Sequence, residues 1–88
     1  SFAQRAHSLA LDIPWRSHTP ELLAELERIT LDCGGRVDLA KDSALSADGF
    51  TAMYPDCDRF IAVLQRLDPA GRFQSDQARR LGLRTYAP

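Results

Sequence analysis

The sequence predicts a small α+β unit with one or two short strands and three to four helices. Two patterns lead to this prediction. Leu9, Leu11 and Ile13 alternate with small or polar residues, which is typical of a half-buried strand that Pro14 would end. Further along the chain, apolar residues recur at spacings of three and four, the period of an amphipathic helix.

The first helix is predicted between Thr19 and Gly34. Thr19 is a suitable N-cap, and Pro20 fits the first helical position, where no amide donor is needed. Gly34 suits the left-handed conformation that commonly follows a helix. The apolar stripe of this helix consists of Leu22, Leu23, Leu26 and Ile29, with Cys33 at its end.

A second short strand is predicted at residues 37–40, where Val37 and Leu39 alternate with charged residues. Lys41 and Asp42 would then lie where this strand ends. Two strands alone make a poor sheet and leave backbone groups unpaired at their edges. The pattern therefore predicts that further strands come from elsewhere.

Three more helices are predicted after residue 45. Ser46, Asp56 and Ser75 are their candidate N-caps, and residues 68–71, Asp-Pro-Ala-Gly, have the composition of a turn. The middle helix has one apolar side, which consists of Phe60, Ile61, Val63, Leu64 and Leu67.

Composition excludes several classes of function. The net charge of -1 gives no field that attracts nucleic acid or an anionic membrane, and no apolar run reaches the roughly 20 residues of a membrane span. Cys33 and Cys57 lie in no metal-binding pattern with the two histidines. We expect no metal and two free thiols in a reducing, cytoplasmic compartment, although the sequence does not exclude a disulfide.

Two groups of residues are candidates for chemistry, and no self-contained catalytic motif is present. Lys41 is the one lysine beside ten arginines, and from the end of a strand it would offer a compact positive charge to a cleft. A solvated surface lysine, or a surface ion pair of Lys41 with Asp38 or Asp42, is the alternative. Arg72, Arg79 and Arg80 lie in the segment DPAGRFQSDQARR, residues 68–80, and would suit a phosphate or a nucleic acid. The acidic neighbours in this segment favour an ordinary turn and helix instead.

Residues 34–83 resemble the C-terminus of bacterial FAD-linked oxidases of the vanillyl-alcohol-oxidase type. The matching segments are GGR, LAKDS, AMYP, LDPAGRF and RRLGL, and LDIP at residues 11–14 is similar to a strand that precedes them. The nearest branch is similar to the decaprenylphosphoryl-ribose oxidases and aldonolactone oxidases. The resemblance implies an alcohol oxidase that transfers a hydride from a sugar or lactone hydroxyl to FAD.

The resemblance also implies a domain assignment. Residues 1–36 would end the substrate (cap) domain, and residues 37–88 would close the FAD-binding domain of a larger two-domain fold. The upstream regions of the parent, or a partner chain, would then be the binding partner. We expect the isolated chain to be inactive and colourless, and either marginally stable or self-associating.

In such oxidases the lysine that matches Lys41 lies beside the pyrimidine edge of the flavin, so Lys41 is the expected cofactor-binding residue. Two positions depart from the pattern: Asp38 replaces an aromatic residue, and Ala10 replaces a cysteine of one branch. Two other functions stay open, a separate structural module that complements a partner chain and, less favoured, a nucleic-acid-binding helix with Arg79, Arg80 and Arg84.

Overall fold

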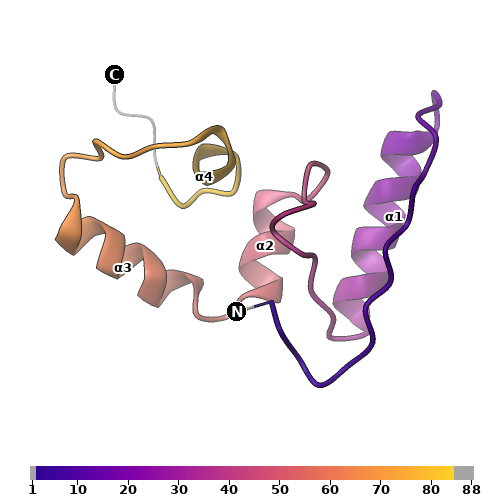
Figure 1. Ribbon diagram of the computed structural model, residues 1–88, viewed down its shortest axis with the longest axis horizontal. Coiled ribbons are helices and arrows are strands. Elements are labelled where there is room, and N and C mark those ends of the chain that lie inside the picture. The colour runs from indigo at the N-terminus through magenta and orange to yellow at the C-terminus, as the bar shows by residue number, and fades with distance from the viewer. Residues whose placement is uncertain (1, 85–88) are drawn as a thin grey trace.

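The computed structural model describes residues 2–84 and contains four helices (Figure 1). They are α1 (Thr19–Asp32), α2 (Ala47–Met53), α3 (Cys57–Leu67) and α4 (Asp76–Arg80). No strand occurs within residues 2–84, so the predicted α+β class is wrong and this part of the chain is helical.

The two predicted strands are irregular for a physical reason. An alternating pattern favours an extended backbone, but a strand also needs a neighbouring segment whose amides and carbonyls pair with its own. Residues 9–13 have no such neighbour, and Leu9 and Leu11 are 82% and 56% exposed. Residues 38–41 instead form a turn, closed by the amide of Lys41 donating to the carbonyl of Asp38 at 3.0 Å.

Helix α1 begins one residue earlier than predicted, because Thr19 is its first residue and not its cap. The Thr19 hydroxyl donates to the carbonyl of Pro14 at 3.1 Å and accepts from the amide of Arg16 at 2.7 Å. Thr19 therefore closes the turn that precedes the helix. At the other end, Gly34 has a φ of 73°, as predicted for the residue that follows a helix.

Two of the three remaining cap predictions are confirmed. The hydroxyl of Ser46 accepts from the amide of Gly49 at 2.9 Å, and that of Ser75 accepts from the amide of Ala78 at 3.0 Å. Asp56 precedes α3, but its side chain makes no capping hydrogen bond.

The hydrophobic core is small and lies where α2 meets the start of α3 and the end of α4. Phe50 and Tyr54 stack at its centre, with ring centroids 5.2 Å apart. Its buried apolar members are Leu45, Phe50, Met53, Tyr54, Cys57 and Leu81. The predicted apolar stripe of α1 lies outside this core, and Leu22 and Ile29 remain 38% and 45% exposed.

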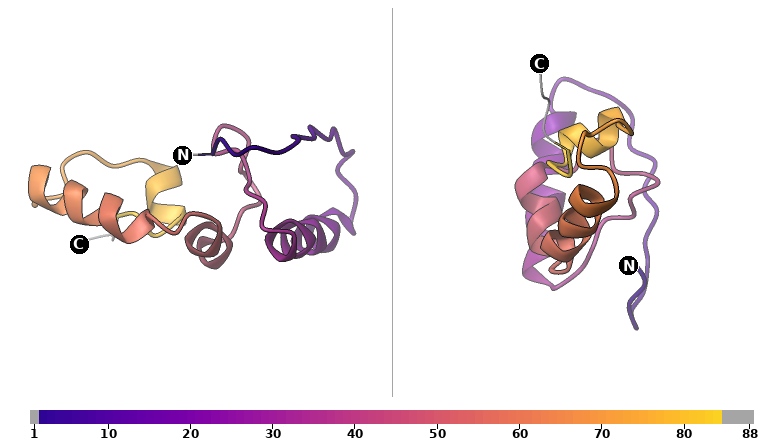
Figure 2. Two further views of the ribbon diagram at one scale, coloured as in Figure 1. Left: turned by 90° about the horizontal axis from the view of Figure 1, so that it is seen from below. Right: turned by 90° about the vertical axis from the view of Figure 1, so that its left-hand side faces the viewer.

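The molecule is thin and open, as the two views of Figure 2 show. Its extents are 39 × 33 × 18 Å, and its radius of gyration of 14.5 Å exceeds the roughly 12 Å of a compact chain of this length. It exposes 7,073 Å², about 1,900 Å² more than a compact protein of its mass. Large apolar side chains lie on that surface, among them Trp15, Phe60, Val63, Leu67 and Phe73.

Candidate functional site

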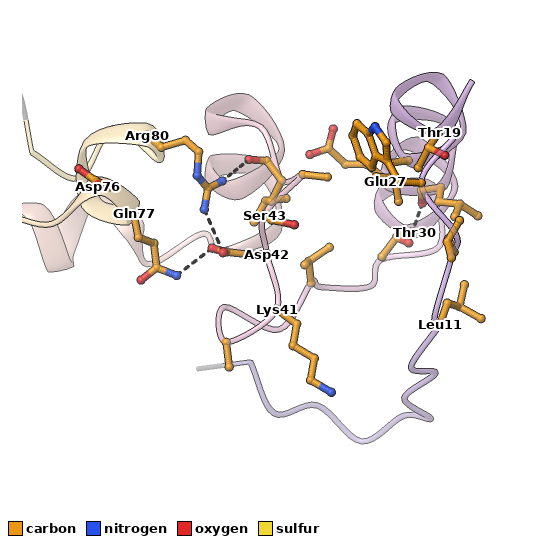
Figure 3. Close-up of a pocket in the computed structure, with 18 residues that line it drawn as sticks. Leu11, Thr19, Glu27, Thr30, Lys41, Asp42, Ser43, Asp76, Gln77 and Arg80 are labelled. Atoms are coloured by element: carbon orange, nitrogen blue, oxygen red, sulfur yellow. Dashed lines mark hydrogen bonds and ion pairs between the residues drawn. The ribbon is translucent and has the colours of Figure 1, made fainter. Parts of the chain in front are cut away.

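An open pocket of about 890 Å³ lies between α1 with its preceding segment and the loop of residues 40–45 with α4 (Figure 3). One wall is largely apolar and includes Leu11, Trp15 and Leu26. The facing wall is polar and includes Lys41, Gln77 and Arg80. Lys41 thus borders this cavity, and it does so from a loop and not from the predicted strand.

The Lys41 side chain is exposed, and in Figure 3 its ammonium group points away from the Asp42 carboxylate. Asp38 forms no ion pair with Lys41 within residues 2–84, and its Oδ1 accepts from the amide of Ala40 at 3.0 Å, which closes a turn. In the described part of the chain Lys41 forms no ion pair, which contradicts a surface pair with Asp38 or Asp42. The exposed side chain fits the alternative of a solvated surface lysine as well as that of a cofactor-binding residue.

Asp42 is held from α4 by Gln77 and Arg80. The Asp42 carboxylate, which is buried, accepts from the Arg80 guanidinium at 2.9 Å and from the Gln77 amide at 2.9 Å. Arg80 also donates to the carbonyl of Leu45 at 2.7 Å, and Gln77 to that of Leu39 at 2.6 Å. We call Asp42, Gln77 and Arg80 the α4 clamp, since they hold both ends of the loop that carries Lys41.

The local sequence explains this arrangement. Gln77 and Arg80 are three residues apart and so share one face of α4, whose first turn is set by the Ser75 cap. The loop meets this face in a turn, where the amide of Leu45 donates to the carbonyl of Asp42 at 2.8 Å. The buried Leu45 side chain anchors that turn in the core.

Tyr54 supports the segment that leads into the loop. Its hydroxyl donates to the carbonyl of Val37 at 2.7 Å, and the guanidinium carbon of Arg36 lies 5.3 Å from its ring centroid. Burial raises the pKa of Tyr54, and the nearby Arg36 charge opposes this effect. The loop is therefore held from α2 as well as from α4.

The arginines that the sequence offered for phosphate or nucleic acid are largely engaged with acids. Arg79 pairs with Asp76, Arg80 with Asp42, and Arg84 with Asp68 at 2.8 Å. Each pair offsets a charge that a phosphate would need. The structure thus favours a structural role for this segment.

Sequence reasoning missed the α4 clamp, although part of its signal was present. The sequence indicated Asp42 as a partner for Lys41, and Arg80 as a ligand for a phosphate or a nucleic acid. The polar spacing of Gln77 and Arg80 on one helical face was the available signal. It did not indicate which of the acids, 35 or more residues away, they would bind.

The two cysteines, the acidic and histidine side chains and the helices bear on the remaining site predictions. Cys33 is exposed, Cys57 is buried, and both thiols are free. Residues 2–84 contain no cluster of three acidic, histidine or cysteine side chains placed to bind a metal ion. No helix in this range is both long and apolar enough to cross a bilayer.

The loop, the clamp and α1 all lie within a region that matches an oxidase family. Residues 11–81 match the model of the D-arabinono-1,4-lactone oxidase family, and the chain belongs to that family. The predicted resemblance to this branch of FAD-linked oxidases is therefore confirmed.

Two curated relatives match nearly the whole chain. This chain is 42% identical over 83 residues to decaprenylphosphoryl-beta-D-ribose oxidase of Mycolicibacterium smegmatis. The aligned region covers 94% of this chain and 18% of that protein. This chain is also 43% identical over 84 residues to an uncharacterized protein in the mprA 5′ region of Streptomyces coelicolor, with 94% and 23% covered. The chain spans less than a quarter of the length of either relative.

Proposed function

We propose that this chain is part of a longer FAD-linked oxidoreductase and that its role is to present Lys41 to the flavin. The parent enzyme would oxidise an alcohol, of the sugar or lactone type, and this segment alone would be inactive. The observation that carries the proposal is an unpaired ammonium group at the edge of a pocket, on a loop held at both ends. The family match supports the choice of cofactor.

The residues present fit one part of FAD. When bound, FAD accepts a hydride from the substrate carbon, and the reduced ring carries negative charge near N1 and the C2 carbonyl. Lys41 supplies a fixed positive charge of the kind that stabilises such an anion. The chain has no glycine-rich phosphate motif, so the grip on the dinucleotide would come from the rest of the enzyme.

We also propose the domain assignment in which residues 1–36 end the cap domain and residues 37–88 close the FAD-binding domain. The boundary rests on the family resemblance, and the exposed apolar surface of this thin molecule supports the presence of a covering neighbour. We call Phe60, Val63 and Leu67, which share one side of α3, the α3 apolar surface, with exposed fractions of 41% to 73%. The upstream part of the parent is its proposed occupant, because an excess surface of about 1,900 Å² is a large area to leave in water.

A second candidate function uses the same surface. The chain would then be a separate structural module that complements a partner carrying the rest of the oxidase. Both candidates require the α3 apolar surface to be covered, and they differ only in whether a peptide bond joins the two parts. The length of the reading frame upstream of Ser1 decides between them.

The test of the proposal is the rate of flavin reduction in the longer oxidase with Lys41→Ala. We expect stopped-flow reduction by substrate to slow by about 100- to 1,000-fold, the usual cost of removing one preorganised charge-stabilising group. Lys41→Arg keeps the charge and is the matched control, for which we expect a smaller loss. Normal reduction in Lys41→Ala, with FAD fully bound, would contradict the assignment.

A further inference from the structure

We infer that Arg80 is a positioning residue for the flavin chemistry, because it occupies the Asp42 carboxylate and so keeps that carboxylate from neutralising Lys41. This inference rests on the proposed function of Lys41. It adds a role for a residue of α4 that itself lies on the far side of Asp42 from the Lys41 ammonium group (Figure 3).

The geometry makes Asp42 the natural competitor for the Lys41 charge. Asp42 follows Lys41 directly in the chain, and its side chain is only 9% exposed. Its Oδ1 accepts from the charged Arg80 at 2.9 Å, whereas its Oδ2 accepts from the neutral Gln77 at 2.9 Å. Arg80 is thus the charge partner that satisfies this carboxylate, and Gln77 adds only a hydrogen bond.

The other acids that line the pocket are also occupied. Glu27 accepts from the amide of Ser46 at 2.8 Å, and Asp76 pairs with Arg79. Asp42 is the third lining acid, and within residues 2–84 none of the three forms an ion pair with Lys41. The arrangement leaves one uncompensated positive charge on this polar wall.

Loss of the Arg80 charge would change that balance. A buried carboxylate without its cation is costly, and it recruits the nearest available positive group. Lys41 is adjacent, exposed and carried on a flexible four-carbon chain. It would turn back toward Asp42, and the pocket edge would then lose both the position and the charge of the ammonium group.

The test combines Arg80→Gln with Asp42→Asn in the FAD-loaded oxidase. We expect Arg80→Gln alone to slow flavin reduction by about tenfold. It should also lower the flavin midpoint potential, because the reduced ring would lose part of the positive charge that stabilises it. Adding Asp42→Asn removes the competing carboxylate and should restore much of both values. Arg80→Lys keeps a charge beside Asp42 and should lose less than Arg80→Gln. A double variant no better than Arg80→Gln would show a purely structural role and overturn the inference.

A second measurement separates this inference from the role of Lys41 itself. Acylation of Lys41 by an amine-directed reagent, followed by peptide mass spectrometry, should slow several-fold in Arg80→Gln and recover in the double variant. An unchanged acylation rate in Arg80→Gln would overturn the inference whatever the flavin does. If Lys41→Ala reduces flavin normally while acylation responds as expected, the proposed function fails and the Arg80–Asp42–Lys41 relationship stands.

Discussion

Glu27 of α1 and Ser46 at the start of α2 are joined by a two-point hydrogen-bonded contact. The carboxylate accepts from the Ser46 amide at 2.8 Å and from its hydroxyl at 3.0 Å, while the same hydroxyl caps α2. Gly49 makes this approach possible, because a Cβ at that position would collide with the Glu27 carboxylate. One acid, one cap and one glycine thus set how α1 lies against α2.

This relationship predicts that the effect of Gly49→Ala on the free energy of unfolding depends on whether residue 27 is Glu or Ala. Alanine favours a helix over glycine by about 1 kcal/mol, but here it would displace Glu27 from Ser46 at a cost of about 1–2 kcal/mol. We therefore expect Gly49→Ala to be neutral or destabilising in the native chain and stabilising in Glu27→Ala. Urea unfolding of the four variants, followed by circular dichroism, measures this coupling. Equal effects in both backgrounds would contradict the contact.

Asp68 predicts a loss of stability in acid. Amide donors of Phe73 and Arg72, with a further contribution from the Arg84 charge, hold the pKa of Asp68 below its ordinary value. As the pH falls, Asp68 is therefore protonated at a higher pH in the unfolded chain than in the folded chain. The stabilisation is complete above the unfolded pKa of about 4 and is lost as the pH falls through the folded pKa.

Asp68→Asn tests this prediction through the unfolding midpoint measured across pH 2–7. We expect a flatter acid limb in Asp68→Asn than in the native chain. Asp76→Asn is the matched control, because it removes an acid from an arginine pair whose carboxylate is fully exposed. An acid limb that is the same in all three proteins would refute the role of Asp68.

Tyr54→Phe should separate a hydrogen bond from ring packing. The variant keeps the stack on Phe50 but removes the donor to the carbonyl of Val37, which we expect to cost about 1 kcal/mol. Burial raises the pKa of Tyr54, so the native chain should also lose stability as the pH rises from about 10 through the folded pKa. Tyr54→Phe should lack this alkaline loss, and thermal melts at pH 8 and pH 11 compare the two proteins. An equal alkaline loss in the variant would assign it to another group.

The α3 apolar surface predicts where the rest of the oxidase binds. Phe60 and Leu67 are 52% and 73% exposed, and replacing both by Glu should weaken association with a separately expressed upstream part by tenfold or more. Copurification on a sizing column and retained FAD absorbance measure the association. Gln65→Glu adds a charge to an exposed position of the same helix and should have little effect. Loss of association in the control as well would point to general charge repulsion.

Local patterns predicted the local structure well. The helix after Thr19, the caps at Ser46 and Ser75, and the left-handed Gly34 each depend on a few neighbouring residues. The alternation at residues 9–13 was misleading, because it reports an extended backbone and not the presence of a second strand. The stripe of α1 misled in a similar way, since an apolar face shows that something is to be covered but not by what.

The sequence predicted one part of the candidate site and not the other. Lys41 could be singled out because it is the one lysine of the chain, and its surroundings matched a known family. The partners of Asp42 could not be assigned from the sequence, because they lie 35 and 38 residues away in the chain. Only the folded structure shows that Asp42 meets Arg80 and that Asp38 closes its own turn.

The α4 clamp has a consequence for how the chain acquires its form during synthesis. Gln77 and Arg80 follow Asp42 by 35 and 38 residues, so they leave the ribosome well after the loop that they hold. Helices α1 to α3 can form first and Tyr54 can already hold Val37, but the contacts of the loop with α4 are missing until α4 is made. A chain interrupted before Gln77 would therefore keep the residues of α1 to α3 while its lysine loop lacked the two side chains that hold it from α4.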